Sequence, residues 1–125
     1  ATALQVARQI ASAVAHLHRR GVMHGDLYAH NILWNPATAQ ALLSDFGAAT
    51  LLPVVGHPLR QALQALEMRA FGVLLQELLA LVGAGPGAEG GVALAALHAL
   101  AQACLLPQPQ QRPEMAEVCA QLAVL

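Results

Sequence analysis

Two long segments of the chain carry apolar side chains at every third or fourth position, which is the spacing of an amphipathic helix. These segments are residues 3–19 and 61–82. Residues 92–105 are apolar on nearly every side, so we expect a third helix buried on several faces, and residues 114–122 predict a closing helix. The expected core of the second helix consists of Leu63, Leu66, Ala70, Phe71, Leu74, Leu75, Leu78 and Leu81.

Two short apolar runs between the first two helices predict a β-hairpin. Residues 32–34 and 41–43 flank a turn that begins with an Asn-Pro pair. Residues 48–60 have no clear period and contain two prolines and a glycine, so we expect a loop there. Residues 83–91 are glycine-rich and predict a flexible connection without chemistry of its own. The expected fold class is therefore mainly α with a small β-hairpin.

The composition excludes several classes of protein. The chain has 125 residues, of which 57% are hydrophobic and 10% charged, whereas a disordered tail has low hydrophobicity and high charge. It has six arginines, no lysine and a net charge of -1, so we expect no nucleic-acid binding. Polar residues interrupt every long apolar run, so we expect no membrane span.

The start of the chain and its cysteines indicate the compartment. The first residues show no secretory leader, and the chain begins with Ala1 rather than methionine, so we expect a segment of a larger intracellular, cytoplasmic protein. Cys104 and Cys119 lie in apolar helical stretches, where we expect buried, reduced thiols rather than a disulfide.

Aspartate is scarce, because Asp26 and Asp45 are the only two in the chain. Asp26 shares a loop with Asn31, and Asp45 follows the second strand of the expected hairpin. We expect the loop and the hairpin to bring two carboxylates and one carboxamide to a single edge. Mg²⁺ accepts such hard oxygen ligands together with phosphate oxygens, and one aspartate can take the proton of an attacking hydroxyl. The spacing therefore predicts metal-assisted phosphoryl transfer.

Four motifs resemble those of protein kinases and occur in the order of that family. HGDLYAHN resembles the catalytic loop, and SDFG resembles the metal-binding motif that follows it. EMRAFGVLLQELL resembles the central helix of the kinase C-terminal lobe, and QRPEMAEV resembles the Arg-Pro helix start near the end of that lobe. The resemblance implies that residues 1–125 are a partial protein kinase domain, its C-terminal (large) lobe, without the N-terminal lobe.

The resemblance also implies a role for each matching residue. Asp26 matches the catalytic aspartate that accepts or orients the proton of the substrate hydroxyl. Asn31 and Asp45 match the two residues that bind magnesium and, through it, the phosphates of ATP. ATP and Mg²⁺ are thus the implied cofactors, and the substrate is a protein hydroxyl, of serine or threonine rather than tyrosine.

Five further residues match structural positions of the family. His24 matches a histidine that packs beneath the metal-binding motif, and Phe46 and Gly47 complete that motif, the phenylalanine helping to set active and inactive states. Glu67 falls where the family has an aspartate that holds the backbone of the catalytic loop. Arg112 matches an arginine whose usual partner, the glutamate of an Ala-Pro-Glu motif, is missing here. His16 and His18 are expected on the surface of the first helix, and His30 and His57 in exposed loops.

The sequence also departs from the family pattern. Gly25 replaces an arginine that contacts phosphorylated activation loops, and Tyr28 replaces a lysine that steadies the transferred group. The segment 47–67 is short for an activation segment. A glycine-rich loop and a phosphate-pairing lysine are both missing, so we expect an N-terminal lobe or other upstream region to be required and the isolated chain to be inactive.

Three alternatives stay open at this point. The His-Gly-Asp loop and short activation segment are most similar to kinase domains attached to leucine-rich repeats. Small-molecule kinases of the aminoglycoside or choline phosphotransferase type share His-Gly-Asp-Leu, although Asp45-Phe46-Gly47 and QRPEMAEV favour the protein kinases. A pseudokinase that binds partners without phosphoryl transfer would also fit the departures at Gly25 and Tyr28.

Overall fold

The computed structural model describes residues 2–82 and 91–125, and these are mainly helical. Short single turns of 3-10 helix lie at Ala29–Asn31 and Pro109–Gln111. The helices and strands are α1 Thr2–Arg19, β1 Val22–Met23, β2 Ile32–Asn35, β3 Gln40–Leu43, β4 Thr50–Leu51, α2 Pro58–Val82, α3 Gly91–Cys104 and α4 Met115–Ala123. The mainly α fold with a small β-hairpin, expected from the sequence, is confirmed, and a second two-stranded sheet, β1–β4, accompanies it.

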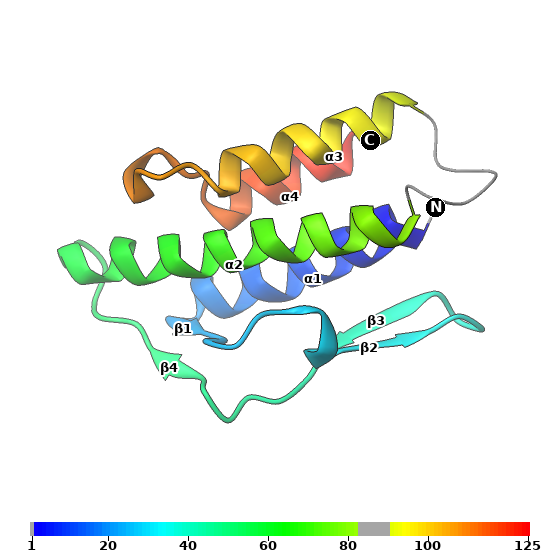
Figure 1. The fold of residues 1–125 in the computed structure, drawn as a ribbon. Helices are drawn as coiled ribbons and strands as arrows, with labels where there is room; N and C mark the ends of the chain where they lie inside the picture. The colour runs from blue at the N-terminus through cyan, green and yellow to red at the C-terminus, as the bar shows by residue number, and fades with distance from the viewer. Residues whose placement is uncertain (1, 83–90) are drawn as a thin grey trace.

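The helices form two layers, and the strands lie on one outer side (Figure 1). Helices α1 and α2 make the central layer, with α4 packed on α1 and α3 packed on α2. The sheets lie on the opposite side of α1, which contacts both β1 and β3. The loop 24–31 therefore runs along the side of the molecule that α3 and α4 leave uncovered.

The core lies between the helices and consists of aliphatic side chains with one phenylalanine. Gly72 of α2 is part of it, because a β-carbon there would lie 2.9 Å from Cys104 of α3. Each large side chain removed from water contributes about 2 kcal/mol. The largest members are Val6, Ile10, Val14, Met68, Phe71, Leu74, Leu75, Leu97, Leu100, Met115, Val118 and Leu122.

Strands β2 and β3 form the hairpin that the sequence predicts. They pair antiparallel with Leu33 opposite Leu42.

The prediction of a loop over residues 48–60 is wrong in two places. Thr50–Leu51 pairs with β1 as β4, and α2 begins at Pro58, because proline suits the first turn of a helix, whose N–H groups need no partner within it.

Three predictions about burial are wrong. Leu66 and Leu81 are exposed, because they lie off the face of α2 that contacts the core. That face runs through Met68, Phe71, Leu75 and Leu79. Helix α3 buries one face only, because it packs chiefly on α2 in the part of the chain described, and Val92 lies in solvent. The connection predicted for residues 83–91 falls almost entirely outside the described residues.

The two cysteines are free thiols. Cys104 is buried, and burial raises its pKa to about 12. Cys119 is only half-buried, which corrects the expectation that both are buried. Within residues 2–82 and 91–125, no helix has the length and apolar character needed to cross a bilayer.

Candidate active site

The loop that carries Asp26 is fastened to the helical core by the carboxylate of Glu67, which is 2% exposed. Its Oε1 accepts the backbone N–H of Gly25 at 2.8 Å, and its Oε2 accepts the backbone N–H of His24 at 2.9 Å. The Nε2 of His18 lies 2.8 Å from the same Oε2. Glu67 therefore joins α1, α2 and the loop.

The surface position predicted for His18 is wrong. The side chain is buried because it lies four residues beyond Val14 and seven beyond Ala11, on the buried stripe of α1. Burial by itself raises the pKa of Glu67, but the hydrogen bonds from His18 and from the backbone of Gly25 and His24 outweigh it and lower that pKa below its ordinary value. Glu67 is thus an ionised, fully partnered carboxylate.

The ring of His24 is fully buried and connects the loop to the segment after β3. Its Nε2 donates to the carbonyl of Ser44 at 2.8 Å, and its Nδ1 accepts the N–H of Asp26 at 3.1 Å. These two contacts together require the neutral ring with its proton on Nε2. Phe46 packs against the same ring in an edge-on arrangement, with centroids 4.9 Å apart.

Asn31 ends a single 3-10 turn and is 3% exposed. Its Nδ2 donates to the backbone carbonyl of Asp26 at 2.7 Å, so the side chain closes the loop on itself. Its own backbone carbonyl accepts two hydrogen bonds from Ser44, one from the N–H and one from the hydroxyl. The amide oxygen Oδ1 accepts no hydrogen bond from any described residue and is thus a buried, unused oxygen.

Asp45 directly follows Ser44 and has a left-handed backbone, with φ of 57°. Aspartate tolerates this conformation better than most residues do, but it is uncommon outside glycine. The side chain is exposed, and Oδ1 accepts the N–H of Gly47 at 3.3 Å. The segment that begins here therefore turns sharply at the end of β3 and presents a carboxylate to solvent.

Asp26 and Asp45 act together on Tyr28. The pKa of the Tyr28 phenol is raised, first by desolvation and then by the negative charges of both aspartates. Neither aspartate forms a salt bridge within residues 2–82 and 91–125. The edge at Tyr28 therefore carries two carboxylates that no described arginine neutralises.

Gly25 allows the chain after Asp45 to cross directly over the loop. It has φ of 85°, and a β-carbon there would press against the carbonyl of Ala48. An arginine, which the family often has here, would meet the same obstruction. The path of the segment after Asp45 therefore requires a glycine at position 25.

Arg112 lies apart from this cluster. Its Nη1 donates to the carbonyl of Ala65 and its Nε to the carbonyl of Leu106, each at 2.9 Å, and it pairs with no carboxylate among the described residues.

The structure brings seven of the eight predicted residues together: His24, Asp26, Asn31, Asp45, Phe46, Gly47 and Glu67. Sequence reasoning missed Ser44 and His18, and only His18 left a signal, its place in the helical stripe.

The chemistry of two side chains near this loop suits magnesium. Asn31 has an unused Oδ1, Asp45 has a carboxylate without a salt bridge in the described chain, and Ser44 connects the backbone of Asn31 to the residue before Asp45. Both side chains are hard oxygen ligands, and the exposure of Asp45 leaves room for water and phosphate oxygens. No three His, Cys, Asp or Glu side chains cluster as a metal site in the part of the chain described, so an all-protein cage is not present there.

Comparison with known proteins adds to this geometry. The sequence profile of the family described as "Protein kinase domain" matches residues 1–80. The Serine/threonine-protein kinase csk1 of Schizosaccharomyces pombe is 27% identical over 138 aligned positions, which cover 91% of this chain and 45% of that protein. The Dual specificity testis-specific protein kinase 1 of Rattus norvegicus is 33% identical over 106 positions, covering 66% of this chain and 17% of that protein.

A solved structure shares the fold. It comes from work on a divergent kinase lacking the glycine-rich loop, which regulates membrane ultrastructure of the Toxoplasma parasitophorous vacuole. The TM-score is 0.73 at 20% sequence identity, over 93% of this chain and 40% of that one. The chain therefore spans less than half the length of these relatives.

Proposed function

This chain belongs to the protein kinase family, and from that premise we propose that it supplies the catalytic and metal-binding part of an enzyme that transfers a phosphoryl group from ATP to a serine or threonine hydroxyl. Residues 1–125 are then a partial kinase domain, its C-terminal lobe. A separate N-terminal lobe covers the nucleotide. The lengths of the relatives support this division, because the chain spans 45% of csk1 and 40% of the similar solved structure.

The observation that carries the proposal is the double hydrogen bond between Ser44 and the carbonyl of Asn31. It holds the backbone of Asn31 beside the segment that begins with Asp45, and the side-chain amide of Asn31 is held in turn by the carbonyl of Asp26. The side chains of Asn31 and Asp45 would hold Mg²⁺, whose charge, when bound, offsets that of the ATP phosphates. The left-handed backbone of Asp45 also supports a functional role, since such conformations gather at active sites.

Asp26 would accept the proton of the substrate hydroxyl. Its backbone is held on both sides, the N–H by the ring of His24 and the carbonyl by the amide of Asn31. Its carboxylate forms no hydrogen bond with a described residue, so it is free to receive a hydroxyl. General-base catalysis of this kind contributes about 10²- to 10⁴-fold to a rate.

The outer face of the hairpin supports the presence of a covering lobe. Leu33 and Leu42 lie opposite each other in the β2–β3 register, with 58% and 61% of their surface exposed. An exposed apolar pair of this kind next to the Asp45 segment favours contact with a nucleobase and with further protein. The upstream region of the parent chain is the part we assign to this role.

Two finer assignments follow from the same proposal. The His-Gly-Asp loop and the short segment 47–67 support a subgroup similar to kinase domains attached to leucine-rich repeats. An ATP-dependent enzyme with free cysteines also fits the cytoplasmic part of a larger protein, because ATP and reducing conditions occur together there.

One observation favours a second function, a pseudokinase that binds partners without transfer. The backbone of Ala48 lies against Gly25, so the arginine that contacts phosphorylated activation loops in many kinases could not take this place without a shift of the segment. Under this alternative the site keeps its shape but does not turn over ATP.

A phosphoryl-transfer assay distinguishes the active kinase from the pseudokinase. The longer protein that includes the region upstream of Ala1 should transfer labelled phosphate from ATP to a mixed serine/threonine peptide, and Asp26→Asn should lower kcat at least about 100-fold. Residues 1–125 alone should show no turnover. A thermal unfolding curve serves as the folding control for Asp26→Asn. An unchanged rate in Asp26→Asn would overturn the assignment of Asp26, and no transfer by the wild-type protein would favour the pseudokinase.

A further inference from the structure

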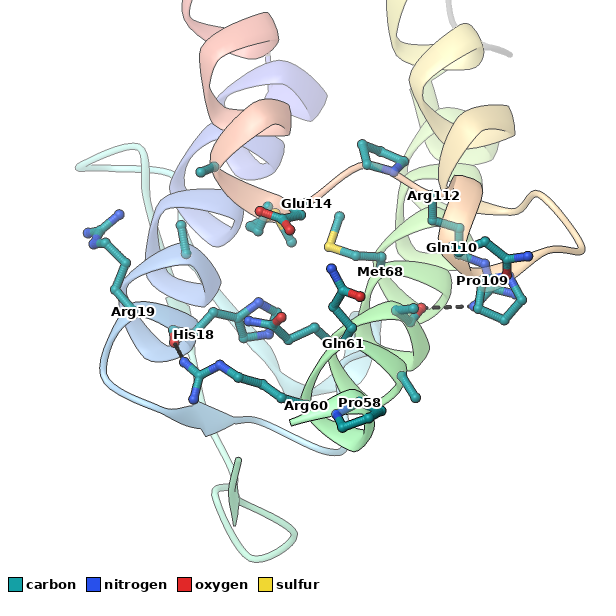
Figure 2. Close-up of a pocket in the computed structure, with 17 residues that line it drawn as sticks. His18, Arg19, Pro58, Arg60, Gln61, Met68, Pro109, Gln110, Arg112 and Glu114 are labelled. Atoms are coloured by element: carbon teal, nitrogen blue, oxygen red, sulfur yellow. Dashed lines mark hydrogen bonds between the residues drawn. The ribbon is translucent and has the colours of Figure 1, made fainter. Parts of the chain in front are cut away.

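A cavity of about 550 Å³ lies beside the end of α1. It is enclosed by the end of α1, the first half of α2 and the segment 109–116 (Figure 2). Neither Asp26 nor Asp45 lines it. Its volume falls in the range of ligand pockets, about 300 to 1,000 Å³.

The cavity is positively charged although the chain as a whole is not. Three of the six arginines line it, Arg19, Arg60 and Arg112, and they surround it from different sides in Figure 2. Glu114 is the carboxylate among its lining residues. An anion placed between the guanidinium groups would therefore meet an excess of positive charge.

The hydrogen bonds of these arginines leave their charge unmatched. Arg60 donates to the carbonyls of Pro53 at 2.8 Å and His18 at 3.0 Å, and Arg112 likewise donates only to carbonyls. Arg19 is exposed and forms no hydrogen bond with the described residues. Since each guanidinium has five N–H donors, all three retain donors for an oxyanion.

The rest of the lining suits a peptide. The side-chain amides of Gln61, Gln64 and Gln110 line the cavity and form no hydrogen bonds within the described chain, so they are available to backbone N–H and carbonyl groups. Met68 and Met115 form part of the wall, although each is only 2% exposed, and the exposed rings of Pro58 and Pro109 add apolar surface. Guanidinium groups, amides and apolar rings together match the carboxylates, backbone and aliphatic side chains of an acidic peptide.

We propose that this cavity is a docking site for an acidic peptide segment of a partner protein, with its carboxylates on Arg19, Arg60 and Arg112. The proposal goes beyond phosphoryl transfer and does not depend on it, because the site shares no lining residue with the candidate magnesium ligands. It also holds for a pseudokinase.

Fluorescence anisotropy on residues 1–125 tests it with a labelled peptide, acetyl-Ala-Leu-Glu-Glu-Leu-Ala-amide, and a matched peptide with glutamine in place of glutamate. We expect the acidic peptide to bind and the glutamine peptide to bind at least about tenfold more weakly. Arg19→Glu should weaken the acidic peptide about tenfold, and added salt should weaken it further. Arg69→Glu is the matched control, because Arg69 is an exposed residue of α2 that does not line the cavity.

Each outcome decides for or against the site. If Arg19→Glu does not unfold cooperatively in urea, Arg19→Gln takes its place, with an expected loss of about threefold. Equal binding of the two peptides, or equal weakening by Arg19→Glu and Arg69→Glu, overturns the proposal. Binding of inorganic phosphate that depends on Arg19 while neither peptide binds overturns the assignment to a peptide.

Discussion

Ser44 donates two hydrogen bonds to the carbonyl oxygen of Asn31, one from its backbone N–H and one from its hydroxyl, each at a distance of 2.8 Å. The carbonyl of Ser44 in turn accepts the ring N–H of His24. One residue thus connects the end of β3 with both ends of the loop that carries Asp26. The relative position of Asn31 and Asp45 depends on this connection, and a sequence motif alone does not reveal it.

Ser44→Ala should lower the free energy of unfolding by about 1 kcal/mol, because it removes one hydrogen bond and leaves the backbone bond in place. Urea unfolding of residues 1–125 measures this. Ser12→Ala is the control, since Ser12 is exposed on α1 and forms no hydrogen bond within the described chain. Equal effects of the two substitutions would show that the hydroxyl of Ser44 does not hold the loop.

Glu67→Gln should destabilise the chain by about 2 to 3 kcal/mol. The buried carboxylate accepts three hydrogen bonds, and an amide nitrogen in place of one oxygen leaves a buried N–H group without its acceptor. Glu77→Gln, on the exposed face of the same helix, should cost less than about 0.5 kcal/mol. Urea unfolding compares the two, and a loss in Glu67→Gln no larger than in Glu77→Gln would contradict this role.

The same carboxylate should make stability depend on pH. Burial raises the pKa of Glu67, but the hydrogen bonds from His18, Gly25 and His24 lower it to a net value below the ordinary 4.5. The contribution of Glu67 to the free energy of unfolding is therefore complete above pH 4.5 and is lost as the pH falls through the folded-state pKa. The stability difference between wild type and Glu67→Gln, measured by urea unfolding at several pH values, should shrink below pH 4.5. A constant difference would contradict the lowered pKa.

Gly25→Ala should destabilise the chain more than Gly56→Ala does. Both glycines have positive φ, 85° and 92°, so each substitution carries the backbone cost of about 1 kcal/mol. A β-carbon at Gly56 meets open space, whereas at Gly25 it presses on the carbonyl of Ala48. The difference between the two losses of unfolding free energy therefore measures the cost of the contact between residue 25 and Ala48. Equal costs would mean that the segment after Asp45 does not lie against the loop.

Sequence periodicity predicts the fold well where burial follows one helix face. The stripe of α1 and the β2–β3 hairpin are examples, because local pattern and tertiary packing agree there. It fails where contacts with residues distant in sequence decide the local structure or the burial of a side chain. Thr50–Leu51 becomes a strand only because β1 lies beside it, and Leu66 is exposed because α2 is rotated by its contacts with its neighbours.

The candidate site follows the same rule. Motif order locates Asp26, Asn31 and Asp45, but the groups that hold them come from elsewhere in the chain. His18 reaches Glu67 from α1, and no motif includes it. Its position in the apolar stripe of α1 was the available signal. The role of Ser44 depends on the geometry of the hairpin end, which no pattern of residue types encodes.

The most direct test of the magnesium assignment is a thermal-shift titration of the longer protein with Mg²⁺-ATP. We expect Mg²⁺-ATP to raise the Tm of the wild type and of Asp26→Asn, because Asp26 is not assigned to the metal. Asp45→Asn should lose the Mg²⁺-dependent part of the shift, while asparagine still tolerates the left-handed backbone at that position. No nucleotide-dependent rise in the wild type, or an undiminished rise in Asp45→Asn, would contradict the account.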